Sequence, residues 1–424
     1  MNARKCAWEV LCRMEKAGQY SNLAVDAALR KADPEAADRA LFTALVYGVI
    51  EKKLTLDACI DRFTKENKPD PQVRNLLRLG IYQLLYFDKI PDHAAVNETV
   101  ALAPRRAAGY VNAILRNFLR SGKQIPLPDR EKDPVGYLSV AYSVGRELCA
   151  RLIEEFGEEK TESLLRAVGE KPDLCLFVNT LRVGVEELRE TMAAARYESE
   201  RIGENGLRIA GNAPVTALPG FAEGWFFVQD IASQNCVRAL DPRPGMKLID
   251  VCSCPGSKSF GAAIRMENKG EILSCDLHAS KLPLVEKGAA RLGISIIETK
   301  ERDARNILPE WVGKADRVIC DVPCSGFGVI AKKPELRYKD PAESVGLPII
   351  QAAILKTSSA LVAPGGKLVY STCTILSVEN HSVVADFLQE HPEFSLIEEK
   401  QTYPDTDGVD GFYYAILQRT GGNP

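Results

Sequence analysis

The chain has 424 residues, of which 46% are hydrophobic and 26% are charged, a composition that supports two or three domains with sizeable cores. It has no run of about 18 apolar residues, so a transmembrane helix is not expected. Its first residues, MNARKCAWEVLCRMEK, lack the continuous apolar stretch of a secretory signal. We therefore expect a cytoplasmic protein whose twelve cysteines are mostly free thiols.

The charge is distributed unevenly along the chain. Residues 1–125 contain 20 Lys and Arg against 14 Asp and Glu, whereas the remaining residues contain 34 against 43. A basic amino-terminal region on a mildly acidic body fits a module that binds a polyanion such as RNA. Ordinary surface charge would explain the same balance equally well.

The amino-terminal region, residues 1–125, is predicted to be an all-helical bundle. Ala7, Val10, Leu11 and Met14 recur at helical spacing, and similar apolar patterns follow further along the region. The polar, proline-containing stretch between Ser121 and Pro134 matches neither helical nor strand periodicity. We place a linker at residues 126–136 and a small α/β subdomain at residues 137–225.

Residues 226–424 change to an alternation of strands and helices. Strands are predicted at 247–252, 271–276, 294–300, 316–322 and 365–372, with helix-length segments between them. This alternation indicates a mostly parallel, Rossmann-like sheet. Two more strands, 393–399 and 411–419, are predicted to form an antiparallel hairpin at the edge of that sheet.

Acidic residues stand at or just after four of the predicted strands, namely Asp250, Asp276, Asp303 and Asp321. Asp276 ends the second strand, where doubly wound folds place the carboxylate that accepts hydrogen bonds from a ribose. Single aspartates at such places are often only turn or cap residues. Four in register favour a nucleoside-binding crevice at the carboxyl end of the sheet.

The turn after the first of these strands reads Cys252, Ser253, Cys254, Pro255, Gly256, Ser257, Lys258. It matches neither a GxGxxG loop nor a P-loop, and the absence of a P-loop disfavours a nucleoside triphosphatase. Cys252 and Cys254 have no nearby CxxC or histidine pair to complete a tetrahedral zinc site, so no metal is expected.

Cys324 and Cys373 differ from the other cysteines because each follows the end of a predicted strand, within DVPCSG and YSTCT. Methylation of pyrimidine carbon 5 needs such a thiol. A thiolate that adds to carbon 6 makes carbon 5 nucleophilic toward the methyl group of S-adenosyl-L-methionine. Asp321, three residues before Cys324, is placed to assist proton transfer at the ring.

The motifs DVCSCPGSKS, CDLHASKL, ERDAR, DVPCSGFG and LVYSTCTILSVEN, in this order, resemble those of the Nop2/Sun class of RNA (cytosine-5) methyltransferases. The amino-terminal HAAVNETVALA and YVNAILRNFLR resemble a NusB-like RNA-binding domain. The resemblance covers nearly the whole chain. It implies a class I methyltransferase domain that uses S-adenosyl-L-methionine to methylate a cytosine of 16S ribosomal RNA.

The resemblance also implies roles for the catalytic residues. Cys373 would be the nucleophile that adds to cytosine, and Cys324 would assist release of the methylated RNA. Asp321 would lie near both the cofactor and the cytosine, and Lys258 would orient the catalytic groups.

The cofactor residues follow from the same resemblance. Residues 252–258 would surround the methionine part of S-adenosyl-L-methionine. Asp276 would hold the ribose hydroxyls, Asp303 would contact the adenine, and Asp321 would approach the cofactor.

Three positions depart from the family pattern. Ser257 replaces the second glycine of the usual Pro-Gly-Gly-Lys turn, and a positive φ there would strain the serine by about 1–2 kcal/mol. Cys254 precedes the proline where relatives have small residues. Ile416 stands where relatives often have a lysine.

Alternatives remain open at this point. The same chemistry could act on transfer RNA or another RNA, the two thiols could exchange roles, or the chain could be a non-catalytic RNA-binding factor. We expect a monomer that binds neither a membrane nor a metal.

RNA contacts are predicted at three places. These places are the helical face with Arg105, Arg106, Arg116, Arg120 and Lys123, the loop Lys332-Lys333-Pro334, and the segment Phe177–Arg182.

Overall fold

A computed structural model describes residues 2–17, 21–32, 35–64, 67–170, 172–211 and 214–421. The chain forms two compact units, which we call the helical unit (1–169 with 332–341) and the sheet unit (170–331 with 342–424). The backbone passes from one unit to the other at 169/170, 331/332 and 341/342. Within the described ranges, every helix is too short or too polar to cross a membrane.

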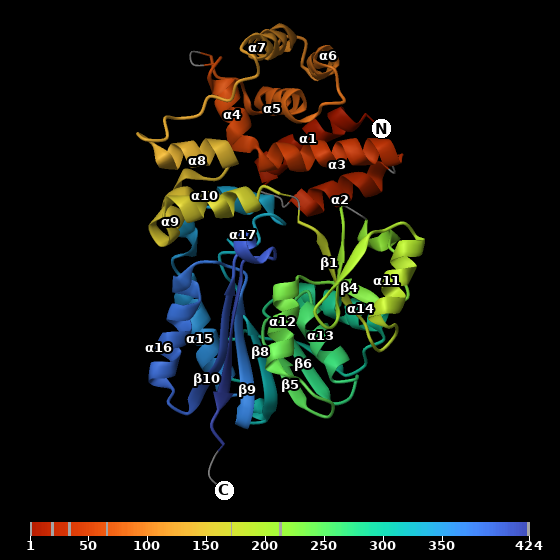
Figure 1. Cartoon of the computed structure of the whole chain (residues 1–424), viewed down its shortest axis with the longest axis vertical. Coiled ribbons are helices and arrows are strands. Elements are labelled where there is room, and N and C mark those ends of the chain that lie inside the picture. The colour runs from red at the N-terminus through yellow and green to blue at the C-terminus, as the bar shows by residue number, and fades with distance from the viewer. Residues whose placement is uncertain are drawn as a thin grey trace. The chain divides into compact units, whose positions relative to one another are not determined.

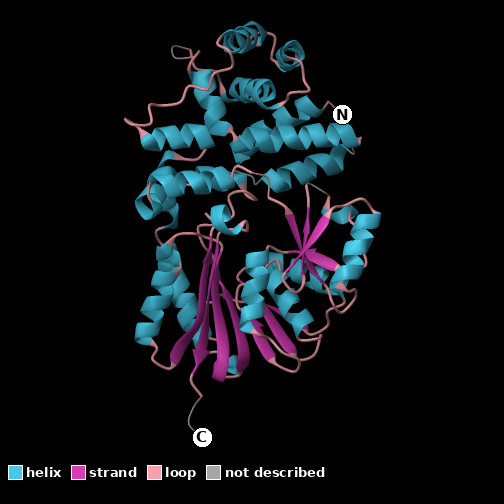
Figure 2. Cartoon of the chain, viewed as in Figure 1, coloured by secondary structure: helices cyan, strands magenta, loops and turns pink. Residues whose placement is uncertain are grey.

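The regular structure described in the helical unit is helical, as Figure 2 shows. Its helices are α1 (Ala3–Ala17), α2 (Ser21–Ala32), α3 (Ala36–Glu51), α4 (Lys53–Asp61), α5 (Pro71–Tyr86), α6 (Asp92–Leu102), α7 (Ala108–Arg120), α8 (Pro134–Tyr142), α9 (Arg146–Phe156) and α10 (Glu158–Ala167). The expected all-helical amino-terminal bundle is thereby confirmed. Local chemistry fixes some starts: Asp70 accepts a hydrogen bond from the Val73 amide, and Pro71 begins α5.

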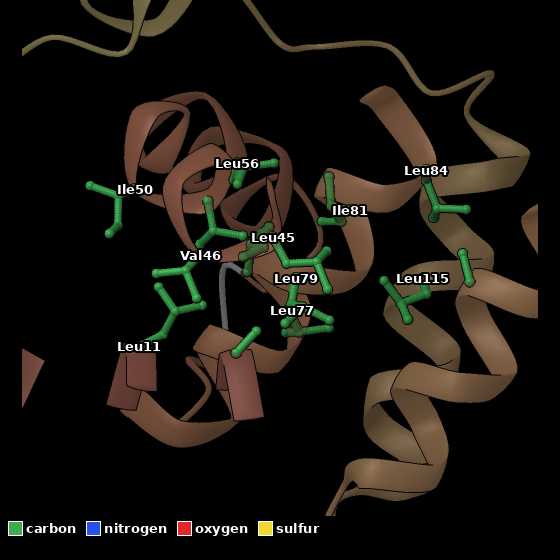
Figure 3. Close-up of a cluster of buried hydrophobic side chains, with 14 of the residues drawn as sticks. Leu11, Leu45, Val46, Ile50, Leu56, Leu77, Leu79, Ile81, Leu84 and Leu115 are labelled. Atoms are coloured by element: carbon green, nitrogen blue, oxygen red, sulfur yellow. The ribbon is translucent and has the colours of Figure 1, made fainter. Parts of the chain in front are cut away.

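The core of this bundle is built from the apolar faces of α1, α3, α4, α5 and α7. Figure 3 shows Leu45 and Val46 of α3 packed near Leu77 and Leu79 of α5. These side chains are fully buried, and Leu115 of α7 belongs to the same cluster. The apolar residues that recur every three or four positions thus meet at one interior.

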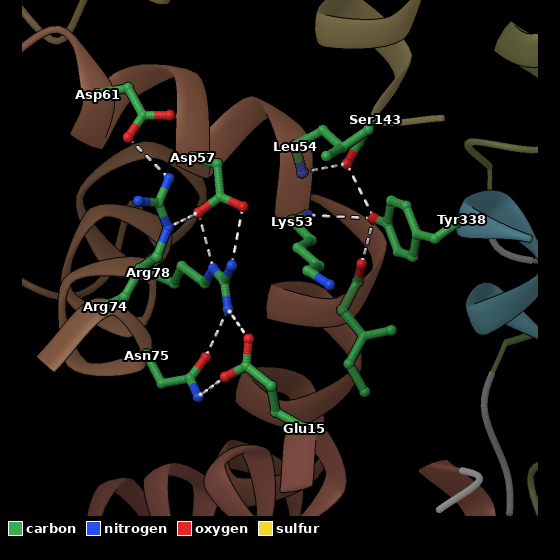
Figure 4. A network of polar contacts seen from close by, with 11 residues as sticks. Glu15, Lys53, Leu54, Asp57, Asp61, Arg74, Asn75, Arg78, Ser143 and Tyr338 are labelled. Carbon is green, nitrogen blue, oxygen red and sulfur yellow. Dashed lines mark hydrogen bonds and ion pairs between the residues drawn. The ribbon is translucent and has the colours of Figure 1, made fainter. Parts of the chain in front are cut away.

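A polar network lies beside this core (Figure 4). The guanidinium of Arg78 donates to both carboxylate oxygens of Asp57 at 2.8 Å, and its third nitrogen donates to Asn75 at 2.8 Å. Arg74 donates to Asp57 and Asp61, also at 2.8 Å. These pairs join α4 to α5, and the buried arginine needs them because an unpaired charge inside a bundle is costly.

A segment from far along the sequence completes the helical unit. It contains the 3₁₀ helix η4 (Pro334–Tyr338), which follows the loop of Cys324 by only a few residues. The Tyr338 hydroxyl bonds to Ser143 Oγ at 2.9 Å, accepts from the Lys53 amide at 3.2 Å and donates to the Ile50 carbonyl (Figure 4). The segment is therefore held by polar contacts with α3, α4 and the end of α8.

The sheet unit begins with a four-stranded antiparallel sheet in the order β2-β3-β1-β4. Its strands are β1 (Leu174–Val178), β2 (Ser199–Ile202), β3 (Gly206–Ile209) and β4 (Phe226–Val228), with α11 (Val185–Ala194) between β1 and β2. Leu188 and Met192 of α11 are buried against Leu176 and Leu207 of this sheet.

The second sheet has seven strands in the order β10-β11-β9-β8-β5-β6-β7. The strands are β5 (Lys247–Asp250), β6 (Glu271–Asp276), β7 (Ile297–Glu301), β8 (Ala315–Asp321), β9 (Val362–Thr372), β10 (Phe394–Thr402) and β11 (Phe412–Arg419). The five strands from β7 to β9 are parallel, and β10 and β11 pair antiparallel at the β9 edge. The predicted parallel sheet and its terminal hairpin are both confirmed.

Helices cover both faces of the seven-stranded sheet (Figure 1). They are α12 (Ile231–Leu240), α13 (Ser257–Arg265), α14 (Leu282–Leu292), α15 (Leu347–Ser359) and α16 (His381–Glu390), with the short α17 (Pro404–Asp407) before β11. Side chains alternate between two cores, since Leu248 packs with Phe260 and Val285, whereas Ile249 packs with Ile354. Burial on both faces explains the continuous apolar runs of the parallel strands.

Candidate active site

The sheet topology brings the two singled-out cysteines together. β8 and β9 are parallel neighbours, with Asp321 opposite Ser371, so the loops that follow them leave the same edge of the sheet. The sulfur atoms of Cys324 and Cys373 lie 3.2 Å apart, and the Cys373 amide donates to the Cys324 sulfur at 3.3 Å. Both cysteines are partly accessible. The arrangement can present two thiols to one substrate base.

The environment of Cys324 disfavours its thiolate. The hydrogen bond with Cys373 raises the pKa of Cys324 above its ordinary value, and burial and the nearby negative groups raise it further. Either thiol can donate in the contact between the two sulfurs.

A charged pair links α13 to the end of β8, the strand that leads to Cys324. Nζ of Lys258 donates to Oδ2 of Asp321 at 2.7 Å, while Ser371 Oγ donates to Oδ1 at 2.7 Å. Burial alone would lower the pKa of Lys258, but the Asp321 carboxylate and other negative groups raise it. The same ammonium lies 5.1 Å above the ring of Phe412. Lys258 is thus a fixed cation that orients Asp321.

The turn after β5, residues 252–258, is compact, and we call it the cradle. The Ser253 amide donates to the Cys275 carbonyl at 2.7 Å, which ties the turn to β6. Gly256 has φ 109°, and a Cβ there would lie 2.5 Å from the Phe260 ring, so this position requires glycine. Ser257 instead begins α13 and has no positive φ. The strain considered for Ser257 is therefore absent, because the left-handed position is the preceding residue.

Asp250 lies buried under this turn. Ser259 donates to its carboxylate at 2.7 Å and also bonds to Ser274 at 2.8 Å. Burial raises the pKa of Asp250 to about 7, and the Asp321 charge adds to the rise, although Ser259 and Lys258 oppose it. Asp250 thus supports the cradle from inside the sheet.

The remaining two acidic residues end neighbouring strands. Asp276 closes β6, is 8% exposed and accepts a hydrogen bond from the His278 amide at 3.0 Å. Asp303 follows β7 and is held by Arg305, whose hydrogen bonds lower the pKa of Asp303 to about 2. All four acidic residues therefore belong to the carboxyl-end side of the sheet, as the sequence predicts.

These residues fit S-adenosyl-L-methionine. A ribose needs a carboxylate acceptor, and Asp276 stands at the end of the strand next to β5, where doubly wound folds place that group. The apolar side chain of Leu277, 51% exposed, follows it directly and suits an adenine face. The glycine-dependent turn at Gly256 allows close approach of the backbone to a ligand.

The structure corrects one predicted RNA contact. Phe177 is 2% exposed and stacks on Phe227 with ring centroids 5.0 Å apart, and Asn179 is fully buried with its amide bonded to the Gly224 and Leu292 carbonyls. The first half of the segment Phe177–Arg182 therefore belongs to the core. A strand is expected to expose every second side chain, but this one is buried on both faces. Ile416 is likewise 1% exposed within β11 and offers no polar contact.

The basic residues predicted to contact RNA are mostly at the surface. Arg105, Arg106, Arg116 and Arg120 are exposed, and so are Lys332 and Lys333, whereas Pro334 is buried. Lys123 forms an ion pair with Asp92 at 2.7 Å. Sequence reasoning missed the polar residues behind the cysteine loops, chiefly Glu379 and Asn380. The only signal for them was their place in LVYSTCTILSVEN.

Comparison with known families matches three parts of the chain. Residues 1–120 match the NusB family, residues 147–216 match the ferredoxin-like domain of RsmF/B-like methyltransferases, and residues 237–418 match the family described as 16S rRNA methyltransferase RsmB/F. The matches follow the order of the helical bundle, the small sheet and the seven-stranded sheet.

Similar proteins match along the whole chain. A protein of Bacillus subtilis named "Probable ribosomal RNA small subunit methyltransferase B" is 36% identical, and the match covers 99% of both chains. A "Ribosomal RNA small subunit methyltransferase B" of Klebsiella pneumoniae is 31% identical over 98% of both. Among solved structures, that of the protein PH0851 has a TM-score of 0.83 at 27% identity and covers 99% of this chain and 98% of its own. NSun6 from Pyrococcus horikoshii has a TM-score of 0.60 at 20% identity, covering 65% of this chain and 98% of its own, which shows a shared fold.

The motif order, the paired cysteines and the full-length similarity agree with one another. The chain belongs to the RsmB/F family of S-adenosyl-L-methionine-dependent 16S rRNA methyltransferases and carries a NusB-family amino-terminal region.

Proposed function

We propose that the paired thiols methylate carbon 5 of a cytosine in 16S ribosomal RNA through a covalent adduct between Cys373 and the base. The observation that carries this proposal is the 3.2 Å separation of the Cys324 and Cys373 sulfurs at the carboxyl end of two adjacent parallel strands. Ligands of open α/β sheets bind at that edge. Two adjacent thiols suit a reaction that makes and then breaks a carbon–sulfur bond, since one can bond to the base while the other takes part in its release.

In this mechanism the Cys373 thiolate adds to carbon 6 of the cytosine, and the electrons of the 5,6 double bond shift toward carbon 5 and ring nitrogen 3, which makes carbon 5 nucleophilic. Asp321, oriented by Lys258 and Ser371 and three residues before Cys324, would assist proton transfer at the ring. S-adenosyl-L-methionine supplies the methyl group when bound. The Cys324 sulfur, in its thiolate form, would then accept the carbon 5 proton, so that the 5,6 double bond is restored and the Cys373 thiolate leaves.

The cofactor would be held by the residues of the cradle. Residues 252–258 would surround its methionine part, Asp276 would accept hydrogen bonds from the ribose hydroxyls, and Asp303 would contact the adenine. The buried, fixed positions of Asp276 and Lys258 support this assignment, because neither side chain needs to be ordered on binding.

The functions of the separate domains are also a proposal. Residues 1–125 would bind RNA as a NusB-like domain, 126–136 would link it to an RNA-binding subdomain at 137–225, and 226–424 would carry the chemistry. The exposed Arg105 and Arg106 would contact phosphates. We propose that the enzyme acts as a monomer in the cytoplasm.

Trapping with a 16S transcript that contains 5-fluorocytosine tests the proposal, because fluorine cannot leave carbon 5 as a proton does. Native enzyme and Cys324→Ala should form a stable adduct, and Cys373→Ala should form none. Bisulfite mapping of 16S RNA incubated with the native enzyme should reveal one new 5-methylcytosine. An adduct with Cys373→Ala but not with Cys324→Ala would instead assign the nucleophile to Cys324. Methylation of a transfer RNA with no change in 16S RNA would reject the proposed substrate.

A further inference from the structure

Two adjacent residues, Glu379 and Asn380, form hydrogen bonds with the residues that flank Cys324 and Cys373. Glu379 ends the 3₁₀ helix η6 (Ser377–Glu379), and Asn380 precedes α16. Each residue is only 1% exposed, so neither side chain faces solvent. Buried polar side chains of this kind are retained for the hydrogen bonds that they make.

Glu379 holds the backbone on one side of Cys324. Its Oε2 accepts a hydrogen bond from the Ser325 amide at 2.9 Å and another from Gln351 Nε2 at 2.9 Å. The same Gln351 nitrogen donates to the Pro323 carbonyl at 3.0 Å. The residues before and after Cys324 are therefore both fixed, one directly by Glu379 and one through Gln351.

Asn380 does the same for Cys373. Its Oδ1 accepts from the Thr372 hydroxyl at 2.5 Å, and its Nδ2 donates to the Thr374 carbonyl at 3.0 Å. The residues before and after Cys373 are thereby joined to one amide side chain. Nδ2 also donates to Gln401 Oε1 at 2.8 Å, which anchors the amide to β10.

The hydrogen bonds around Cys324 and those around Cys373 are connected to each other. The Ser325 hydroxyl bonds to the Thr374 hydroxyl at 2.7 Å, so the residues that follow the two cysteines are connected. The hydroxyl of Tyr370, fully buried in β9, donates to the Glu379 carbonyl at 2.6 Å and fixes the dipeptide to the sheet. A rigid frame of this kind can hold two sulfurs at one separation through repeated turnovers.

We propose that Glu379 and Asn380 are positioning residues with separate duties, Glu379 setting the place of Cys324 and Asn380 setting the place of Cys373. The inference rests on the proposed use of the two thiols but not on which of them is the nucleophile. The charge of Glu379 has a second effect. After the hydrogen bond with Cys373, burial and the charge of Cys373, the Glu379 carboxylate also contributes to raising the pKa of Cys324, which disfavours the Cys324 thiolate.

Adduct trapping separates these duties. We expect Glu379→Ala to reproduce the phenotype of Cys324→Ala, and Asn380→Ala to reproduce that of Cys373→Ala, each with turnover reduced about 100-fold by misplacement of its sulfur. This pairing holds even if the thiols exchange roles, so a failed nucleophile assignment would not be mistaken for a failed inference. Identical trapping patterns for Glu379→Ala and Asn380→Ala would overturn it.

Controls distinguish positioning from loss of folding. Ser359→Ala removes a buried hydroxyl of α15 whose hydrogen bond, among the described residues, stays within its own helix, to the Lys356 carbonyl, and it should leave turnover and trapping unchanged. Binding of S-adenosyl-L-methionine, measured by calorimetry, should be within about twofold of native for both test variants. Equal loss of cofactor binding and of both thiol functions would mean a structural role only and would reject the proposal.

Glu379→Gln gives an independent test if the alanine variant does not fold. The amide oxygen can still accept from Ser325 and Gln351, so the trapping pattern should return to that of the native enzyme. The charge is lost, and alkylation of Cys324 by iodoacetamide, followed by mass spectrometry, should therefore begin at lower pH than in native enzyme. An unchanged alkylation profile together with a Cys324→Ala-like trapping pattern would contradict the inference.

Discussion

Nζ of Lys258 lies 2.7 Å from Oδ2 of Asp321. This ion pair joins the turn after β5 to the end of β8, and these two strands are neighbours in the sheet although they are not consecutive in the sequence. Lys258 comes from the first turn of α13, and its side chain is only 9% exposed. The pair therefore connects the proposed cofactor cradle to the loop that carries Cys324. Ser371 of β9 bonds to the other oxygen of Asp321 and extends this connection toward Cys373.

Replacement of Lys258 by methionine should reduce methylation about 100-fold, because Asp321 would lose the cation that orients it. The free energy of unfolding should fall by about 1–3 kcal/mol, since one carboxylate would lose a charged hydrogen bond. Denaturant titration and single-turnover methylation measure the two effects. The double variant Lys258→Met/Asp321→Asn should regain most of the stability but not the activity. Recovery of both would mean that the pair serves folding alone.

The pH dependence of stability should contain a contribution from Asp250. Its pKa is about 7 in the folded chain and near 3.8 when unfolded, so the folded state binds more protons between these values. Stability should therefore fall as pH rises from about 4 to about 7, by up to about 1.4 kcal/mol per pH unit from this group. Asp250→Asn, which keeps an acceptor for Ser259, should remove that slope in urea titrations at several pH values. An identical slope in the variant would show that Asp250 titrates normally.

Cofactor affinity should depend on Asp276. Asp276→Ala removes the carboxylate proposed to accept from the ribose hydroxyls, and a lost charged hydrogen bond of about 1.5–3 kcal/mol corresponds to a Kd raised about 10- to 100-fold. Calorimetry with S-adenosyl-L-methionine measures the change. Glu301→Gln is a matched control, because Glu301 pairs with Asp276 in the register of β6 and β7 but is exposed. Equal losses in the two variants would contradict a specific ribose contact.

Tyr338→Phe should destabilise the helical unit by about 1–3 kcal/mol, since three polar groups at least partly shielded from water would lose their shared hydroxyl partner. Amide hydrogen exchange should accelerate at Lys53, whose amide donates to that hydroxyl. Tyr86→Phe serves as the control, because Tyr86 keeps its ring contact with Lys52 and its hydroxyl has no hydrogen-bond partner in the described part of the chain. Unchanged exchange at Lys53 would show that the hydroxyl does not hold the segment.

The sequence alone located the main elements and the residues of the candidate site. Parallel strands buried on both faces must be continuous and apolar, so their ends, and the residues just beyond them, can be located from hydrophobicity. Cys324 and Cys373 were identifiable for this reason, and so were Asp250, Asp276 and Asp321. The terminal hairpin followed from its turn residues and its two apolar runs.

Other features required the three-dimensional structure. Glu379 meets Ser325 across 54 residues of sequence, and the segment around Tyr338 meets Ser143 across 195, so no local pattern could reveal these partners. The burial of Phe177 depends on packing from Phe227, and the conformation of Ser257 depends on which neighbour takes the left-handed turn. Local periodicity records which face of an element is apolar. The choice of hydrogen-bond partner for a buried polar group is made only when distant segments pack together.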